Sequence, residues 1–293
     1  MTSIIDLAVL GGSGFYEMPG LEEIEEFAVD TPFGQPSDAI RVGTLEGRRV
    51  AFLARHGRDH SILPSELPQR ANFWALKSLG VERVLAVSAV GSLAEEYRPG
   101  EMAVPDQLID RTRGVRPPTF FGEGVVAHVG FAEPFCNELR RAALVAAGDA
   151  GVRAHDGGTY IVIEGPAFGT RAESHMYRSW GASVVGMTAL PEAKLAREAE
   201  LCYAVLSAIT DYDAWHEHHD AVDAATVFAV LQKNVETSRA VVRQLVASLP
   251  LAGDCSCRTT LDSALVTQPE NIAGTSRSRL APILERRLGV LPR

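Results

Sequence analysis

Apolar residues recur along this chain in short runs, with turn residues and segments of helical repeat between them. The runs typical of strands cover residues 4–10, 40–45, 50–54, 83–88, 102–109, 159–164, 183–185 and 201–210. Patterns typical of amphipathic helices cover residues 69–79, 134–150, 171–180 and 191–198. Strands that alternate with helices predict an α/β fold with a largely parallel central sheet.

The last third of the chain has a different pattern. One face of a long predicted helix carries apolar residues at three- and four-residue steps, namely Val227, Leu231, Val235, Val242, Leu245 and Leu249. Pro250 ends this helix, and a polar loop from about residue 251 leads to a short helix near residues 276–288. Because no repeat or linker interrupts the pattern, we expect one domain over residues 1–293 with loops around a cleft.

Composition narrows the classes of function. The 293 residues are 46% hydrophobic and 22% charged, which is enough to bury a full core. The net charge is −9 without a basic block, which argues against nucleic acid and anionic membranes as partners. The chain has no apolar run of about 18 residues and no basic stretch before its first apolar run, so we expect a cytoplasmic protein.

The apolar run at 201–210 stops at two carboxylates, Asp211 and Asp213. A continuous apolar run predicts a strand buried on both faces, whose end lies at the ligand-binding edge of the sheet. If the backbone stays extended, the two carboxylates point the same way. They could then accept hydrogen bonds from an amino group, and one could carry a proton if its pKa is raised, which suits a 6-aminopurine. Alternatively, Asp211 starts a turn and Asp213 caps a helix.

Polar residues suited to an anion follow other predicted strands. Gly11-Gly12-Ser13-Gly14 follows the first strand, although its spacing is not the dinucleotide fingerprint and a tight turn would explain it equally well. Arg55 and His56 end another strand; a guanidinium can bind two phosphate oxygens, whereas the alternative is a surface arginine and a structural histidine. We expect one anion site built from Ser13, Arg55, His56, Ser88 and Thr188.

Several longer motifs occur together in a characteristic order. They are Gly-Gly-Ser-Gly, Thr31-Pro-Phe-Gly34, Ala54-Arg-His-Gly57, Ala71-Asn-Phe-Trp74, Ala132-Glu-Pro-Phe135, Ile163-Glu-Gly-Pro166, Arg171-Ala-Glu-Ser174 and Thr210-Asp-Tyr-Asp-Ala-Trp215. From residue 4 to about 288 the chain resembles the trimeric purine nucleoside phosphorylases, above all the branch that acts on 5'-methylthioadenosine. The resemblance implies a single α/β domain with a mixed central sheet, curled toward a barrel and flanked by helices. It also implies a homotrimer or homohexamer.

The resemblance assigns roles to individual positions. Phosphate would be held by Ser13, Arg55, His56, Ser88, Thr188 and the Ala89 backbone amide. Met187 would contact the ribose, Phe168 would pack on the purine, Asp211 would face N7, and Asp213 would face the 6-amino group. The 5' substituent would meet Ala224, Val227, and His128 from a neighbouring subunit. Asp211 and His56 are the expected catalytic residues.

The implied reaction is phosphate-dependent cleavage of 5'-methylthioadenosine to adenine and 5-methylthioribose 1-phosphate, a step of purine and methionine salvage. Phosphate is a co-substrate, and neither a cofactor nor a metal is expected. Three positions depart from the branch: Gly186 replaces an asparagine, Ala167 an arginine, and Gly169 a serine. Gly186 is shared with other branches, whereas Ala167 and Gly169 remove polar contacts beside the base and the ribose and leave open a phosphorylase of another 5'-deoxyadenosine (5'-deoxy or 5'-halo). A 6-oxopurine nucleoside phosphorylase is a further alternative.

Other classes of protein are less consistent with these residues. A hydrolytic nucleosidase would not need the anion-binding pair Arg55 and His56. A nicotinamide-dependent dehydrogenase would need a third glycine and a ribose-binding acid. A nucleoside sensor without catalysis would be expected to lose Arg55, His56 or Asp211, and all three are present.

Two segments resemble metal or redox motifs. His216-Glu-His218-His219-Asp220 contains three histidines, but we expect a solvated loop or a lid over the 5' pocket rather than a metal site. Cys136 and Cys202 lie in apolar runs and are expected to be core thiols. Cys255 and Cys257 have a spacing that is oxidised in some members of the family, and here we expect free thiols.

Overall fold

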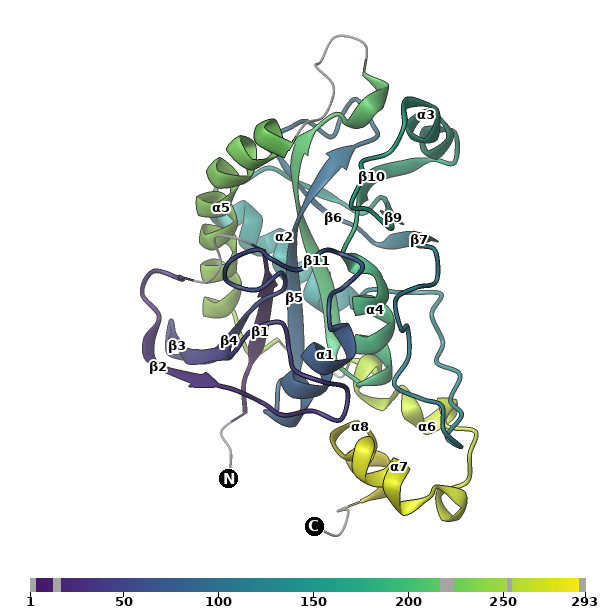
Figure 1. The fold of residues 1–293 in the computed structure, drawn as a ribbon. Helices are drawn as coiled ribbons and strands as arrows, with labels where there is room; N and C mark the ends of the chain where they lie inside the picture. Colours follow the sequence, from purple (N-terminus) through teal and green to yellow (C-terminus); the bar gives the residue numbers. More distant parts are fainter. Residues whose placement is uncertain (1–3, 13–16, 217–223, 252–254, 290–293) are drawn as a thin grey trace.

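A mixed sheet forms the centre of the molecule, and helices cover both of its faces (Figure 1). This computed structural model describes residues 4–12, 17–216, 224–251 and 255–289. In these residues the sheet has 11 strands: β1 (Leu7–Gly11), β2 (Glu22–Phe27), β3 (Ile40–Leu45), β4 (Arg48–Ala54), β5 (Arg83–Ser92), β6 (Met102–Val104), β7 (Gln107–Arg111), β8 (Ala154–Asp156), β9 (Thr159–Ile163), β10 (Ala182–Gly186) and β11 (Cys202–Asp211).

The strand order brings the predicted site residues to one edge. The main path of the sheet is β2-β3-β4-β1-β5-β10-β9-β7, and β11 pairs with β5 and β6. Strand β1 is parallel to both β4 and β5, and β5 is parallel to β11. The carboxyl ends of these four strands therefore lie side by side. The predicted mixed α/β sheet flanked by helices is confirmed. The path does not join β2 to β7, so the sheet is not closed into a barrel.

The helices divide between the two faces of the sheet. They are α1 (Gln69–Ser78), α2 (Asn137–Asp149), α3 (Arg171–Ser179), α4 (Ala189–Glu198), α5 (Ala224–Ala247), α6 (Leu261–Ala264), α7 (Gly274–Arg279) and α8 (Ala281–Leu288). Successive side chains of a strand point to opposite faces. On β1, Ala8 and Leu10 pack with residues of α1 and α4, whereas Leu7 and Val9 pack with residues of α2 and α5. Both faces are thus buried, as the apolar runs predict.

Some predicted elements differ from the observed ones. Strand β2 was not predicted, because its sequence Glu-Glu-Ile-Glu-Glu-Phe is polar and exposed, as on many edge strands. The short strand β8 was also missed. The strand predicted at 102–109 is two strands, since Pro105 interrupts the ladder between β6 and β7. The helix predicted at 276–288 is likewise two helices, α7 and α8.

The C-terminal helices return to the core. In Figure 1, α7 and α8 lie below α1, and the indole Nε1 of Trp74 donates a hydrogen bond to the carbonyl oxygen of Arg279 at 2.9 Å. Buried Leu280, Ile283 and Leu284 join the apolar core on the side of α1 and α4. These contacts support our proposal that residues 1–293 form one domain.

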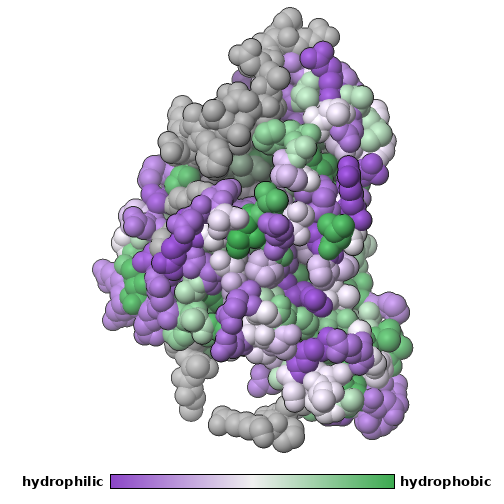
Figure 2. Space-filling view, in the orientation of Figure 1, coloured by the Kyte–Doolittle hydropathy of each residue, from purple (hydrophilic) through white to green (hydrophobic). Residues whose placement is uncertain are grey.

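On the face seen in Figure 2, hydrophobic residues form small groups between hydrophilic ones. Among the described helices, none has the length and the apolar character that a membrane crossing requires.

Candidate active site

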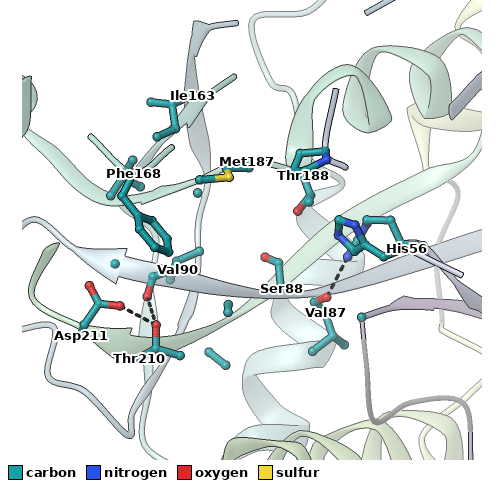
Figure 3. Close-up of a pocket in the computed structure, with 18 of the residues that line it drawn as sticks. His56, Val87, Ser88, Val90, Ile163, Phe168, Met187, Thr188, Thr210 and Asp211 are labelled. Atoms are coloured by element: carbon teal, nitrogen blue, oxygen red, sulfur yellow. Dashed lines mark hydrogen bonds between the residues drawn. The ribbon is translucent and has the colours of Figure 1, made fainter. Parts of the chain in front are cut away.

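A cavity lies at the edge of the sheet where the strands β1, β4, β5 and β11 end, beside α5 (Figure 3). It brings together nine residues that the sequence predicts: Arg55, His56, Ser88, Ala89, Phe168, Met187, Thr188, Asp211 and Asp213. Ser13 lies outside the described residues, as do the side chains of Ala224 and Val227 on α5. His128 is exposed and does not line the cavity of its own chain; its backbone N–H donates to the carbonyl oxygen of Ala264.

The cavity has two chemically different ends. Figure 3 shows Asp211, Thr210 and Phe168 at one end, and His56, Ser88 and Thr188 at the other. We call Asp211, Asp213 and Phe168 the carboxylate end of the cavity. We call Arg55, His56, Ser88 and Thr188 its arginine end.

Arg55 provides a buried positive charge at the arginine end. Its side chain is 1% exposed, and its Nε and Nη2 donate to the two carboxylate oxygens of Glu192 at 2.5 and 3.2 Å. Nη1 donates to the carbonyl oxygen of Val87, and Nη2 also donates to that of Leu10, each at 3.1 Å. These bonds use four of the five N–H groups of a guanidinium. In this geometry Arg55 offers a ligand its charge and at most one further N–H.

His56 lies beside Arg55 as a neutral ring. Its Nδ1 is 2.8 Å from the carbonyl oxygen of Ile62, and only a protonated Nδ1 can donate to that acceptor. Burial, followed by the nearby charge of Arg55, lowers the pKa of His56 to about 4. At neutral pH the ring therefore carries its proton on Nδ1 and presents Nε2 as an acceptor. The ring of His60 stacks on it with the centroids 4.6 Å apart.

Buried hydroxyl groups complete the arginine end. Within the described part of the chain, Ser88 Oγ and Tyr160 Oη are buried without a hydrogen bond of good geometry, although they lie near each other, and Ser88 lines the cavity. Such groups normally have a partner, so a polar ligand at this end would supply one. Tyr160 occupies the space beside Gly186, where a Cβ would lie 2.1 Å from its hydroxyl. The Gly186 that departs from the family pattern is thus required by the tyrosine behind it.

Asp211 is held in a network suited to a protonated carboxyl group. Thr210 Oγ1 lies 2.7 Å from Asp211 Oδ2 and 3.2 Å from the carbonyl oxygen of Val90 (Figure 3). The hydroxyl has one hydrogen, and it donates this hydrogen to Asp211 Oδ2 or to the Val90 carbonyl; a proton on Asp211 would reverse the first bond and leave the hydroxyl hydrogen to Val90. Burial raises the pKa of Asp211, although the hydrogen bonds from Thr210 and the Asp213 amide oppose the shift. The site therefore favours a carboxyl group that holds a proton at higher pH than usual, and Thr210 can accept that proton's hydrogen bond.

Asp213 reaches the same cavity by a different backbone path from the predicted one. Strand β11 ends at Asp211, and Asp213 begins a 3-10 helix (Asp213–Trp215) with φ +48°, so the extended continuation is wrong. The Asp213 amide donates to Asp211 Oδ1 at 2.7 Å, and burial raises the pKa of Asp213. Both carboxylates fit because residue 91 is glycine: a Cβ there would lie 2.9 Å from Asp211 Oδ1.

Phe168 at the carboxylate end and Met187 between the two ends line the apolar part of the cavity (Figure 3). The Phe168 ring is 44% exposed, so a flat ligand packed on it would bury a large apolar surface. Gly165 adopts φ +69° and leaves room for the sulfur of Met187, which would lie 2.5 Å from a Cβ at that position. The buried Arg116 fixes this segment, because its Nη1 donates to the carbonyl oxygens of Met187 and Leu190 at 2.6 and 2.8 Å.

Sequence reasoning missed several residues that shape the site. Glu192 neutralises Arg55, Thr210 bonds Asp211, Tyr160 fills the space beside Gly186, and Arg116 holds the loop of Met187. The role of Thr210 could have been predicted, because it directly precedes the expected acid Asp211. The roles of Glu192 and Arg116 could not, because a single charged residue on a helix or in a loop is normally solvated.

Comparisons with known proteins agree with this geometry. Residues 6–247 match the model of the phosphorylase superfamily. The chain belongs to the phosphorylase superfamily. It is 52% identical to the S-methyl-5'-thioadenosine phosphorylase of Koribacter versatilis, with 97% of each chain covered. It is 54% identical to that of Chloroflexus aurantiacus, over 96% of this chain and 97% of the relative.

Solved phosphorylase structures share the fold. A methylthioadenosine phosphorylase from an antarctic soil metagenomic library superposes with a TM-score of 0.91 at 45% identity, covering 96% of this chain and 99% of the other. The enzyme of Schistosoma mansoni in complex with adenine superposes with a TM-score of 0.79 at 36% identity, covering 83% and 91%. The predicted nucleoside phosphorylase fold and enzyme class are therefore confirmed.

Proposed function

We propose that this protein cleaves the N-glycosidic bond of 5'-methylthioadenosine with phosphate, giving adenine and 5-methylthioribose 1-phosphate. The observation that carries the proposal is one cavity with two complementary ends. Its arginine end has a buried cation and the buried Ser88 hydroxyl, which makes no well-formed hydrogen bond, whereas its carboxylate end has two carboxyl groups of raised pKa. Relatives of about half-identical sequence that bear the name of this enzyme support the choice of substrate.

The chemistry follows from the positions of the two ends. The C1'–N9 bond breaks with its electron pair moving to the base, so the sugar acquires oxocarbenium character. An oxygen of phosphate then donates the electron pair that forms the new bond to C1'. Asp211 gives its proton to N7, and adenine leaves as a neutral molecule. General acid catalysis of this kind contributes about 10²–10⁴-fold, and the orientation of both substrates in one cavity contributes further.

The arginine end binds phosphate through several weak contacts around one charge. Arg55 supplies the positive charge, while Ser88, Thr188 and the Ala89 amide supply hydrogen-bond donors. His56 Nε2, as an acceptor, takes a hydrogen bond from the protonated oxygen of the phosphate dianion. This bond holds the dianion beside C1', and it is the catalytic role we assign to His56. Ser13 remains an expected phosphate ligand.

The carboxylate end selects the base and the rest of the nucleoside. Phe168 packs on the purine, Asp213 accepts a hydrogen bond from the 6-amino group, and Met187 contacts the ribose. The 5' substituent meets Ala224 and Val227, together with His128 of a neighbouring subunit in a homotrimer or homohexamer. The 44% exposure of Phe168 in a single chain supports such a cover. We place the reaction in purine and methionine salvage in the cytoplasm, with phosphate as co-substrate and without a catalytic metal or cofactor.

A phosphorylase of another 5'-deoxyadenosine is the second candidate. Ala167 is exposed, and no described atom lies within 4 Å of a Cβ placed on Gly169. The polar side chains expected at these two positions are therefore replaced by open space beside Phe168. This space would tolerate a different sugar substituent without changing the mechanism.

The test is base release from 5'-methylthioadenosine, 5'-deoxyadenosine, adenosine and inosine, each with and without phosphate. We expect adenine release that requires phosphate and is fastest with 5'-methylthioadenosine. Release without phosphate would overturn the proposal in favour of a hydrolytic nucleosidase. Phosphate-dependent release that is fastest with 5'-deoxyadenosine would keep the mechanism and replace the substrate.

A further inference from the structure

All four cysteines of the chain meet at one point, at the opposite end of β11 from Asp211. Cys136 precedes α2, Cys202 is the first residue of β11, and Cys255 and Cys257 belong to the turn that begins the 3-10 helix Ser256–Thr259. Their Sγ atoms all lie within 4.8 Å of one another, and all four are free thiols. The sequence predicts unconnected thiols, so this convergence is a finding of the structure.

The distances between the four sulfur atoms suit a tetrahedral metal site. Zinc binds thiolates at about 2.3 Å, which places the sulfur atoms of a tetrahedron about 3.8 Å apart. The distance between Cys136 Sγ and Cys255 Sγ is 3.3 Å, and all four Sγ atoms lie within 4.8 Å of one another, so the cluster is compact enough for the required spacing. Three of the residues are buried and Cys255 is half-buried, as expected of a closed structural site.

The surroundings of the cluster favour negatively charged sulfur. Arg197 Nη1 lies 3.7 Å from Cys257 Sγ, and the Cys257 amide donates to Cys255 Sγ at 3.4 Å. Cys136 stands at the amino end of α2, where the helix dipole stabilises an anion. A disulfide sulfur carries no charge, so these donors and the guanidinium would have nothing to neutralise if the cysteines were paired by oxidation.

We propose that Cys136, Cys202, Cys255 and Cys257 bind one Zn²⁺ ion in a structural site. Each thiol releases a proton and coordinates through its thiolate, so four protons leave and the centre has a charge of −2. Arg197 and the amino end of α2 balance that charge. The ion ties the segment after α5 to both α2 and the start of β11, three parts of the chain that are far apart in sequence. This site lies apart from the reaction, so its test is independent of the proposed function.

The first measurement is a titration of the reduced, metal-free protein with Co²⁺, which replaces Zn²⁺ and reports its ligands by colour. We expect one equivalent to bind with the intense near-ultraviolet charge-transfer bands of cobalt thiolates. Cobalt held by the histidines near residue 218 would lack these bands. The protein isolated without added metal or reductant should contain one zinc per chain, and all four thiols should react after denaturation with a chelator.

Substitutions separate metal binding from simple destabilisation. The double variant Cys255→Ser/Cys257→Ser should lose stoichiometric cobalt binding and the thiolate bands. Val246→Ala is the matched control, because Val246 is fully buried in the same apolar cluster as Cys136 and Cys202 without being one of the four sulfur ligands. It should lower the melting temperature and still bind one equivalent.

Three results would overturn the proposal. One is a reduced protein that binds no cobalt through thiolates. Another is a double variant that binds cobalt as the parent does. The third is protein isolated without reductant that contains no zinc and fewer than four reactive thiols, which would mean that the cysteines form disulfides.

Discussion

The two ends of the cavity hold charge in opposite ways. At the arginine end a guanidinium is buried at 1% exposure, and Glu192 compensates its desolvation. At the carboxylate end, burial raises the pKa of Asp211 and Asp213, and the hydroxyl and amide groups that contact Asp211 are uncharged. Under the proposed function, the first arrangement keeps a permanent charge for the phosphate anion, and the second keeps a proton that can be transferred to the leaving base. A cation beside Asp211 would strengthen binding there but would stabilise the carboxylate and take away the acid.

The largest expected effect is at the carboxylate end. Replacing Asp211 by asparagine keeps the shape and removes the acid, so kcat for 5'-methylthioadenosine should fall by about 10²–10⁴-fold. Steady-state kinetics at saturating phosphate would measure the loss. The KM for phosphate should change little, because phosphate binds at the other end of the cavity.

The control for Asp211→Asn is a change of leaving group rather than a further variant. A purine nucleoside alkylated at N7 departs without protonation, so its cleavage should be nearly as fast in the variant as in the parent. If both kinds of substrate lose the same factor, Asp211 does not act as the acid at N7.

Glu192 is the corresponding test at the arginine end. Glu192→Gln leaves Arg55 buried without its counter-charge, which should cost about 3–5 kcal/mol of the free energy of unfolding. Phosphate should then raise the melting temperature of the variant more than that of the parent, because the bound anion replaces the lost charge. Thermal unfolding with and without phosphate measures both effects.

Glu198→Gln is the matched control on the same helix. Glu198 is buried and accepts hydrogen bonds from Thr119 and the Phe120 amide, and burial raises its pKa to about 7. The carboxyl group of Glu198 is therefore easily protonated in the folded protein, and a neutral glutamine should replace it with little loss. The variant should lose about 1 kcal/mol of the free energy of unfolding, and phosphate should raise its melting temperature no more than that of the parent. Equal behaviour of the two variants would show that Glu192 is a packing residue and does not position Arg55.

The two ends were not equally predictable from the sequence. Asp211 and Asp213 come just after an apolar run that is long enough to identify a buried strand. Arg55 follows a second predicted strand, and Ser88 is the last residue of a third. Since neighbouring parallel strands end at one edge, their meeting in space follows from the pattern. The turn at Asp213 could not be predicted in the same way, because a φ of +48° depends on the packing against Gly91.

Partners across the sheet could not be predicted either. Glu192 lies 137 positions from Arg55, and its surroundings in sequence are those of an ordinary amphipathic helix. The convergence of four cysteines depends on where the chain returns after α5, which hydrophobic periodicity does not specify. Strand β2 could not be predicted for a related reason. Its polar side chains give no strand pattern, and only its pairing with β3 makes it a strand.

His56 gives the arginine end a pH dependence. Its pKa is about 4 in the folded protein and about 6.5 when unfolded, so the unfolded chain binds more protons between these values. The stabilising contribution is complete above pH 6.5 and is lost as the pH falls to 4, by up to about 3 kcal/mol. Denaturant unfolding should show a flatter pH dependence for His56→Gln than for the parent over this interval. Parallel curves would place the ring in a more solvated environment.

The smallest expected effect distinguishes the two carboxylates from each other. Asp213→Asn turns one acceptor into an amide that can donate to a 6-oxo group, so the ratio of kcat/KM for adenosine to that for inosine should fall by about tenfold, or about 1.4 kcal/mol. Asp211→Asn should slow both nucleosides, since both bases leave through N7. An unchanged ratio in Asp213→Asn would remove Asp213 from recognition of the 6-amino group. It would leave Asp213 the backbone role visible in the structure, in which its amide fixes Asp211 Oδ1 at 2.7 Å.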